Sequence, residues 1–310
     1  MGKLRYPSQL PIIYLISSVI ICLSVLLRVA FFTLIERKII ALMHYRKGPI
    51  KVSIIGYLQP ISDAIKLLTK ENLKLSFSLN IILIRGPIVR IIIIIICWLN
   101  FNSIFNHIRN NIKILVILSV ISLSSFSFIL CGWGSNSKYT ILGTNRAISQ
   151  AISYEVCLFL IILTPLYLIK SYNPQTINFL SNSFPFIIWI LPLFLIWFTL
   201  CLAESNRTPF DMSEGESEIV SGFNIEYGGG IFALIFIREY GIILFIRFIT
   251  TLIFLNLSML LLKIIIIRSL FIWTRCCFPR LRYDHLIIIA WKLTLPLSLG
   301  ILTLRIICIL

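Results

Sequence analysis

Acidic side chains are scarce in this 310-residue chain, which holds 12 Asp and Glu against 28 Lys and Arg. Extended polar segments are also scarce, because 58% of the residues are hydrophobic and the mean hydropathy is +0.97. Soluble domains are about 45–50% apolar, so this composition excludes an ordinary soluble domain. The alternation of polar and apolar residues that is typical of membrane β-barrels is missing as well.

Runs of roughly 20 apolar residues recur along the chain, and each is long enough to cross a hydrocarbon core of about 30 Å. The sequence is therefore predicted to form an all-α polytopic membrane protein, with residues 1–310 as a single transmembrane domain. Asn256 and Ser258 mark a hairpin between the sixth and seventh helices. About eight transmembrane helices are predicted, near residues 10–33, 81–101, 112–131, 147–169, 184–202, 229–253, 257–274 and 286–307.

Residue spacings typical of metal sites are missing. The 8 cysteines form no C-x-x-C pair, and the 3 histidines are scattered along the chain. Structural zinc and iron–sulfur sites need clustered ligands at short, regular spacing. We therefore predict that this chain holds no metal.

Basic residues are distributed unequally between the predicted loops. The segments that follow the odd-numbered helices hold 14 Lys and Arg, and the segments on the opposite side hold 6. The richer side faces the cytoplasm or the mitochondrial matrix by the positive-inside rule. Both termini are therefore predicted to face the opposite side.

The first inside loop spans residues 36–80 and contains an amphipathic pattern. In "GYLQPISDAIKLLTKE", from Gly56 to Glu71, apolar residues recur at helical spacing, with Asp63 and Lys66 on the polar side. This pattern predicts a short helix that lies at the membrane surface. A simple surface anchor is the plainest interpretation of it.

A second inside loop, residues 203–228, concentrates half of the acids of the chain in "AESNRTPFDMSEGESEIVSGFNIEY". Its acids are Glu204, Asp211, Glu214, Glu216, Glu218 and Glu226. Thr208 and Pro209 are typical of a helix start, and Asp211 is then placed to close a capping box. A solvated acidic face is one interpretation. Alternatively, repulsion raises the pKa of some of these loop acids, and they titrate as a coupled group.

Four acids lie within or at the ends of apolar spans. Glu36 closes the first predicted helix, Glu204 closes the fifth, and Glu155 and Glu239 lie within the fourth and sixth. Carboxylates inside a membrane are costly and usually mark a proton or substrate path. These acids therefore favour a function in proton handling.

Seven sequence elements occur in an order that resembles a known family. They are "ERKIIALMHYRKGP" at Glu36, "GYLQPISDAIKLLTKE" at Gly56, "GWGSNSKY" at Gly132, "ISYE" at Ile152, the acidic loop, "EY" at Glu239 and "PRLRYDH" at Pro279. Together they resemble the subunit 1 family of the proton-pumping NADH:ubiquinone oxidoreductase, respiratory complex I, in its mitochondrial form. The resemblance covers nearly the whole chain.

The resemblance implies a membrane subunit without a redox centre, in the mitochondrial inner membrane with its termini on the intermembrane-space side. It implies that subunits of the hydrophilic arm form a ubiquinone tunnel with this chain, and that other membrane-arm subunits adjoin it. Ubiquinone is the implied substrate, whereas NADH, FMN and the iron–sulfur clusters belong to partner subunits. The implied tunnel residues are Glu36, Arg37, Arg46, Asp63, Arg207, Phe223, Arg280 and Arg282. The implied proton-coupling residues are Glu155, Glu204, Asp211, Glu214, Glu216, Glu218, Glu226 and Glu239.

Three other functions compete with this interpretation. The first is the quinone-independent anchor subunit of a membrane-bound hydrogenase-type complex. The second is an independent ion channel or secondary transporter, although the inverted repeats common in transporters are not found in the sequence. The third is an inert scaffold, which leaves Glu155 and Glu239 unexplained.

Several arginines depart from the family pattern. Arg238 adjoins Glu239, and we hypothesise that it pairs with that carboxylate or with another intramembrane acid. Isolated arginines in lipid are costly. Lipid headgroups or neighbouring subunits are therefore the expected contacts of the arginines in or near spans, which are Arg28, Arg85, Arg90 and Arg247.

Overall fold

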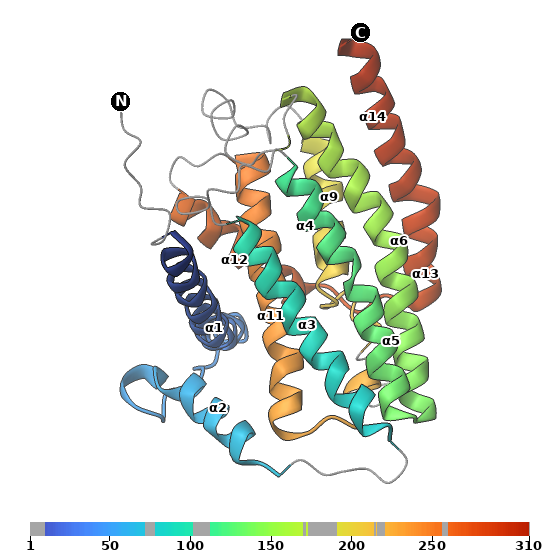
Figure 1. The fold of residues 1–310 in the computed structure, drawn as a ribbon. Coiled ribbons are helices and arrows are strands. Elements are labelled where there is room, and N and C mark those ends of the chain that lie inside the picture. The colour runs from blue at the N-terminus through green and yellow to red at the C-terminus, as the bar shows by residue number, and fades with distance from the viewer. Residues whose placement is uncertain are drawn as a thin grey trace.

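The computed structural model describes residues 10–71, 78–101, 112–169, 172, 191–213, 215, 221–255 and 260–309. Every regular element in these ranges is helical (Figure 1). Six of the described helices are long and apolar enough to cross a membrane. These findings confirm the prediction of an all-α polytopic membrane protein.

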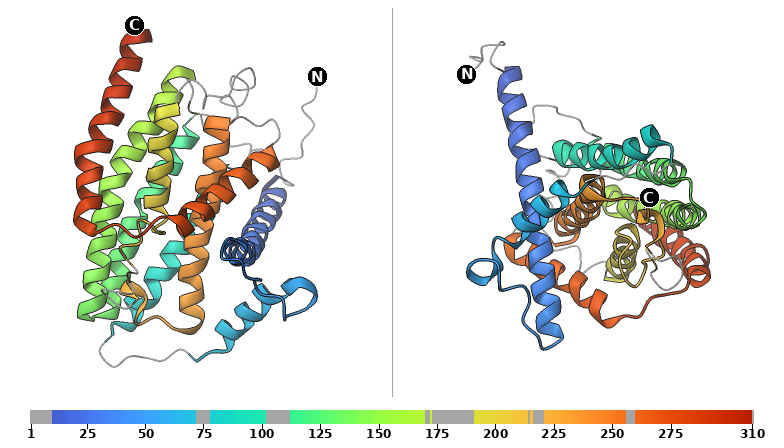
Figure 2. Two further views of the ribbon diagram at one scale, coloured as in Figure 1. Left: turned by 180° about the vertical axis from the view of Figure 1, so that it is seen from behind. Right: turned by 90° about the horizontal axis from the view of Figure 1, so that it is seen from below.

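The helices pack side by side as a bundle (Figures 1 and 2). Its members are α1 (Leu10–Met43), α3 (Asn80–Phe101), α4 (Lys113–Ser122), α5 (Ser124–Ser135), α6 (Lys138–Ile169), α9 (Leu191–Glu204), α11 (Gly229–Thr250), α12 (Leu260–Cys277), α13 (Tyr283–Ile288) and α14 (Leu295–Ile309). Each predicted span corresponds to one of these helices or to a consecutive pair. The predicted hairpin at Asn256 and Ser258 lies outside the described residues.

Two helices extend well beyond their apolar segments. α1 continues to Met43 instead of ending near residue 33, and α6 begins at Lys138 instead of near residue 147. Hydropathy marks only the part of a helix that lipid surrounds, whereas "ERKIIALM" consists largely of good helix formers. Glu36 and Arg37 therefore lie on a helix.

Two predicted spans are interrupted. The third divides at Leu123 into α4 and α5. The last contains a π-helical segment, η4 (Ile289–Thr294), between α13 and α14. Pro296 follows this segment. Proline has no N–H group and its ring crowds the carbonyl four residues earlier, so a wider turn before it relieves the clash.

α1 crosses the bundle obliquely, as the view from below shows (Figure 2). Its 34 residues extend about 51 Å at 1.5 Å per residue, which exceeds a hydrocarbon core of about 30 Å and favours tilting. The amphipathic segment forms α2 (Gln59–Thr69), which packs against α1 and α11. α2, the α5–α6 turn and the start of α11 lie at one end of the bundle, and the end of α14 lies at the other (Figure 1).

The centre of the bundle packs closely around α3, α5 and α6. Gly134 of α5 lies so close to α3 that a Cβ atom there would be 2.6 Å from the backbone nitrogen of Leu83. The Tyr227 hydroxyl donates a hydrogen bond to the Cys131 carbonyl at 3.1 Å, which joins the segment before α11 to α5. These contacts hold α11, which carries several of the candidate residues, against the rest of the bundle.

Candidate functional site

An apolar cavity of about 610 Å³ lies between α1, α2 and α11. Pro60, Ala64 and Leu67 of α2 line it, together with the first half of α11 and the middle of α1. Its lining comprises Leu26, Val29, Ala30, Thr33, Arg37, Pro60, Asp63, Ala64, Lys66, Leu67, Phe232, Ala233, Phe236, Ile237 and Tyr240. The volume is within the range of about 300–1,000 Å³ that small-molecule sites occupy.

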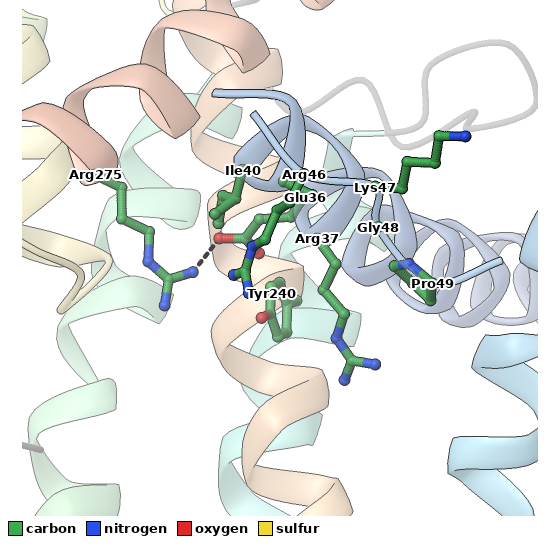
Figure 3. Close-up of a pocket in the computed structure, with 10 residues that line it drawn as sticks. Glu36, Arg37, Ile40, Arg46, Lys47, Gly48, Pro49, Tyr240 and Arg275 are labelled. Atoms are coloured by element: carbon green, nitrogen blue, oxygen red, sulfur yellow. Dashed lines mark hydrogen bonds and ion pairs between the residues drawn. The ribbon is translucent and has the colours of Figure 1, made fainter. Parts of the chain in front are cut away.

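A second cavity, of about 470 Å³, adjoins the first because Arg37 and Tyr240 line both (Figure 3). Its lining comprises Glu36, Arg37, Ile40, Ala41, Arg46, Lys47, Gly48, Pro49, Tyr240 and Arg275. Four basic side chains and one carboxylate make this cavity polar and positively charged. Together the two cavities suit a molecule with an apolar tail and a polar head.

Consecutive residues of α1 serve different sides of this site. Arg37 Nη1 donates to Asp63 Oδ2 of α2 at 2.8 Å, and Gln59 Nε2 donates to Asp63 Oδ1 at 2.9 Å. The Arg37 side chain is 55% exposed, so the pair positions α2 while adding at most about 1 kcal/mol of stability. Glu36, about 100° around the helix, is buried at 6% exposure and pairs with Arg275 of α12 (Figure 3).

Arg207 connects the cavities to an intramembrane carboxylate. Its guanidinium lies 4.7 Å from the ring centroid of Tyr240, which lines both cavities. Its Nη2 lies 3.6 Å from Glu239 Oε2, and both side chains are largely buried. Ring and carboxylate together therefore hold this cation beside the polar cavity.

Arg238 lies one residue before Glu239 but contacts a different acid. Its Nη2 is 4.0 Å from Glu204 Oε1, with Arg238 1% exposed and Glu204 5% exposed. The hypothesised partner is therefore another intramembrane acid, at the end of α9. Glu155 of α6 interacts electrostatically with Glu204 and lies within hydrogen-bonding reach of Ser122. Glu239, Arg238, Glu204 and Glu155 thus form a series that leads from the cavities into the bundle.

Gln150 fixes the start of the acidic loop. Its Nε2 donates to the carbonyl oxygens of Ala203 and Phe210, each at 2.9 Å, and its side chain is buried. Residues 207–213 are not helical, and the Thr208 hydroxyl donates to the Arg275 carbonyl at 3.4 Å. The predicted helix start at Thr208 is therefore wrong, because a tertiary contact uses the expected capping group.

Three predicted tunnel residues lie away from both cavities. Phe223 packs edge-to-face on Phe128 at 5.5 Å. Arg280 packs against Gly215 of the acidic loop. Arg282 is exposed and pairs with Asp284 at 3.1 Å.

The acidic loop is only partly described. Asp211 and Glu226 are partly buried and do not line either cavity. Glu214, Glu216 and Glu218 lie outside the described residues. Their predicted coupling therefore stays a prediction from the sequence.

The expected contacts of Arg90 and Arg247 with headgroups or neighbouring subunits are wrong. Both side chains are buried within the bundle. Arg90 lies 3.9 Å and 4.5 Å from the ring centroids of Phe128 and Phe223, and its Nε donates to Ser127. Arg247 lies similarly between two phenylalanine rings. Stacking on aromatic faces partly replaces hydration for a guanidinium.

Arg28 and Arg85 are exposed on the bundle surface, and the Arg28 guanidinium lies 5.9 Å from the ring centroid of Trp98. Their contact with lipid headgroups or neighbouring subunits stays a prediction.

Tyr240 and Arg275 are the main site residues that the sequence interpretation missed. Tyr240 was visible as the second letter of the "EY" element, and Arg275 as a basic residue at the inside end of the seventh span. The sequence does not show which residues these two side chains contact. Among the described residues, no group of three or more His, Cys, Asp or Glu side chains is placed to hold a metal ion.

Comparison with known proteins extends this description. A sequence model of a family described as NADH dehydrogenase matches residues 16–306. The chain is 44% identical over 292 residues to a protein of Aedes aegypti, which covers 93% of both chains. It is 43% identical to a protein of Rhipicephalus sanguineus, with 90% of each chain covered, and 44% identical to one of Branchiostoma lanceolatum, with 91% covered. All three are named NADH-ubiquinone oxidoreductase chain 1.

Proposed function

The chain belongs to the NADH dehydrogenase family as a membrane subunit of an H⁺-translocating NADH:ubiquinone oxidoreductase, and we propose that it forms the ubiquinone-access tunnel of that enzyme. We further propose that its buried carboxylates couple quinone reduction to proton translocation. The chain itself binds no cofactor in this proposal, since NADH, FMN and the iron–sulfur clusters belong to partner subunits. It spans the mitochondrial inner membrane with both termini on the intermembrane-space side.

The adjoining cavities carry the tunnel proposal. Ubiquinone joins a long apolar tail to a polar ring, and the lining changes from apolar to charged at Arg37 and Tyr240. Apolar walls with a few polar groups are the usual arrangement for such a ligand. The tail occupies the space between α1, α2 and α11, and the ring approaches the basic cavity from there.

Arg275, Arg37 and Tyr240 have separable tasks in this scheme. Arg275 neutralises the buried Glu36 and so allows this carboxylate to lie beside the quinone ring (Figure 3). Arg37 and Tyr240 lie where the two cavities join and offer N–H and O–H donors to the quinone carbonyl oxygens. Partner subunits of the hydrophilic arm supply the electrons and close the tunnel on the inside face.

The series of ion pairs supports the coupling proposal. Arg207 contacts the Tyr240 ring on one side and Glu239 on the other. A change of charge on the quinone ring therefore alters the electric field at Glu239. Arg238 lies within electrostatic reach of both Glu239 and Glu204. A change in the charge of one pair therefore changes the electrostatic energy of the next pair, because charges interact strongly where water is excluded.

Arg37→Ala in the assembled enzyme tests the tunnel. Loss of a charged donor should lower ubiquinone reductase activity about tenfold or more, while NADH oxidation by a hydrophilic artificial acceptor stays near the wild-type rate. Arg85→Ala is the matched control, because Arg85 is exposed on α3 away from both cavities. Equal loss of both activities in Arg37→Ala would refute the proposal. An anchor that binds no quinone predicts no quinone-specific loss.

A further inference from the structure

A third cavity, of about 200 Å³, lies between α6 and α14 at the end of the bundle far from α2. Its lining comprises Leu163, Thr164, Tyr167, Tyr172, Leu302, Arg305 and Ile306. α14 lies at the edge of the bundle beside α6 (Figures 1 and 2). The cavity therefore opens where a lipid bilayer meets the outer surface of the protein.

The polar groups of this cavity lie at the membrane boundary. Tyr167 lies three residues before Lys170, which ends the apolar run of α6 in the sequence, and Arg305 lies near the end of α14, which runs to Ile309. Both helices run in the same direction, so these ends lie at the same face. Tyrosine and arginine at such a boundary are typical of contact with lipid headgroups.

Three donor side chains of this cavity lack a partner within the described part of the chain. No hydrogen bond or ion pair involves the side chain of Arg305, Tyr167 or Tyr172 among the residues that the structure describes. The segments predicted to face this side of the membrane contain no Asp or Glu. They are residues 1–9, 102–111, 170–183 and 254–256. The side chains predicted to face this side therefore offer Arg305 no anionic partner, and another molecule can supply one.

We propose that this cavity binds the phosphate of an anionic phospholipid. The phosphate oxygens accept hydrogen bonds from the Arg305 guanidinium and the two tyrosine hydroxyls. An acyl chain then follows the apolar residues Leu163, Leu302 and Ile306 along the groove between α6 and α14. Free phosphate gains nothing from these apolar walls, whereas an acyl chain buried against them adds hydrophobic stabilisation.

The bound lipid attaches the last helix to the bundle. Among the described elements, α14 makes its main contacts with α6 and η4. A phosphate held between Arg305 of α14 and Tyr167 of α6 adds a link at the end where α14 leaves the bundle. This inference is independent of the quinone tunnel, so its failure leaves the proposed function unaffected.

The test uses the delipidated, assembled complex in mixed micelles of phosphatidylglycerol or phosphatidylcholine. Arg305→Gln should retain about one anionic phospholipid fewer by mass spectrometry and need about tenfold more phosphatidylglycerol for the same thermal stabilisation. Tyr167→Phe should shift the titration in the same direction by less. Lys292→Gln, exposed near the middle of the same span and outside the cavity, is the matched control and should behave like the wild type.

Several results would overturn the proposal. They are wild-type lipid retention in Arg305→Gln, equal stabilisation by phosphatidylcholine, stabilisation by inorganic phosphate alone, and a neighbouring subunit's side chain in the cavity of the assembled complex. If Arg305→Gln does not assemble, Tyr167→Phe decides the question. An unchanged phosphatidylglycerol titration in that variant then counts against the proposal.

Discussion

Arg238→Met removes one side of the buried pair between Arg238 and Glu204 while keeping the bulk of the side chain. At 4.0 Å the two charges attract with a gross energy of about 4 kcal/mol for an effective dielectric constant near 20. The desolvation of both groups offsets much of this attraction in the intact pair. A lone carboxylate at Glu204, 5% exposed, keeps its desolvation cost and loses its counterion. Breaking such a pair typically costs about 3–5 kcal/mol.

The double variant Arg238→Met with Glu204→Gln removes both charges, so it should be more stable than Arg238→Met alone. The assay is the amount of assembled complex on native gels and its thermal inactivation midpoint. These values are compared across the wild type, both single variants and the double variant.

Arg90→Met is the matched control. Arg90 is also fully buried, but no described carboxylate lies within 4.0 Å of it. Its removal relieves a desolvated charge and forfeits stacking on two phenylalanine rings, so it should cost less than Arg238→Met. The reasoning is refuted if the effects of Arg238→Met and Glu204→Gln simply add in the double variant, or if Arg90→Met is as damaging as Arg238→Met.

Three further predictions concern the coupling path and the acidic loop. Glu239→Gln should lower the number of protons translocated per NADH oxidised, and an unchanged ratio in reconstituted vesicles would contradict the coupling proposal. Gln150→Leu leaves the carbonyls of Ala203 and Phe210 without their donor and should lower complex stability by about 2–4 kcal/mol, measured by thermal inactivation. Glu216→Gln removes one charge from the loop, which lowers the pKa of the remaining acids and should move the pH profile of quinone-coupled turnover to lower pH. An unmoved profile favours a solvated acidic face.

Local features were predictable where neighbouring residues carry the whole signal. The amphipathic helix α2 follows from apolar spacing between Ile61 and Leu68, and the membrane class follows from uninterrupted apolar runs. Helix ends were less predictable, as α1 and α6 show. Their polar extensions are stabilised by contacts with distant segments, such as the pair between Glu36 and Arg275.

Tertiary contacts also overruled two local expectations. Thr208 has the sequence context of a helix cap, but its hydroxyl donates a hydrogen bond to a backbone carbonyl of α12. Arg90 has the context of a lipid-facing cation, but aromatic rings from α5 and the segment before α11 enclose it. In both cases the partner lies far away in the sequence, where a local pattern does not show it.

The sequence by itself determined the membrane class, the approximate spans, the family and the positions of the few carboxylates. Each of these depends on composition or on motifs within short segments. The tertiary structure alone decided that Glu36 pairs with Arg275 across 239 positions, and that Arg238 contacts Glu204 instead of the adjacent Glu239. Successive side chains on a helix point about 100° apart, so neighbours in the sequence face different directions. Which distant side chain each of them contacts depends on how the other helices pack.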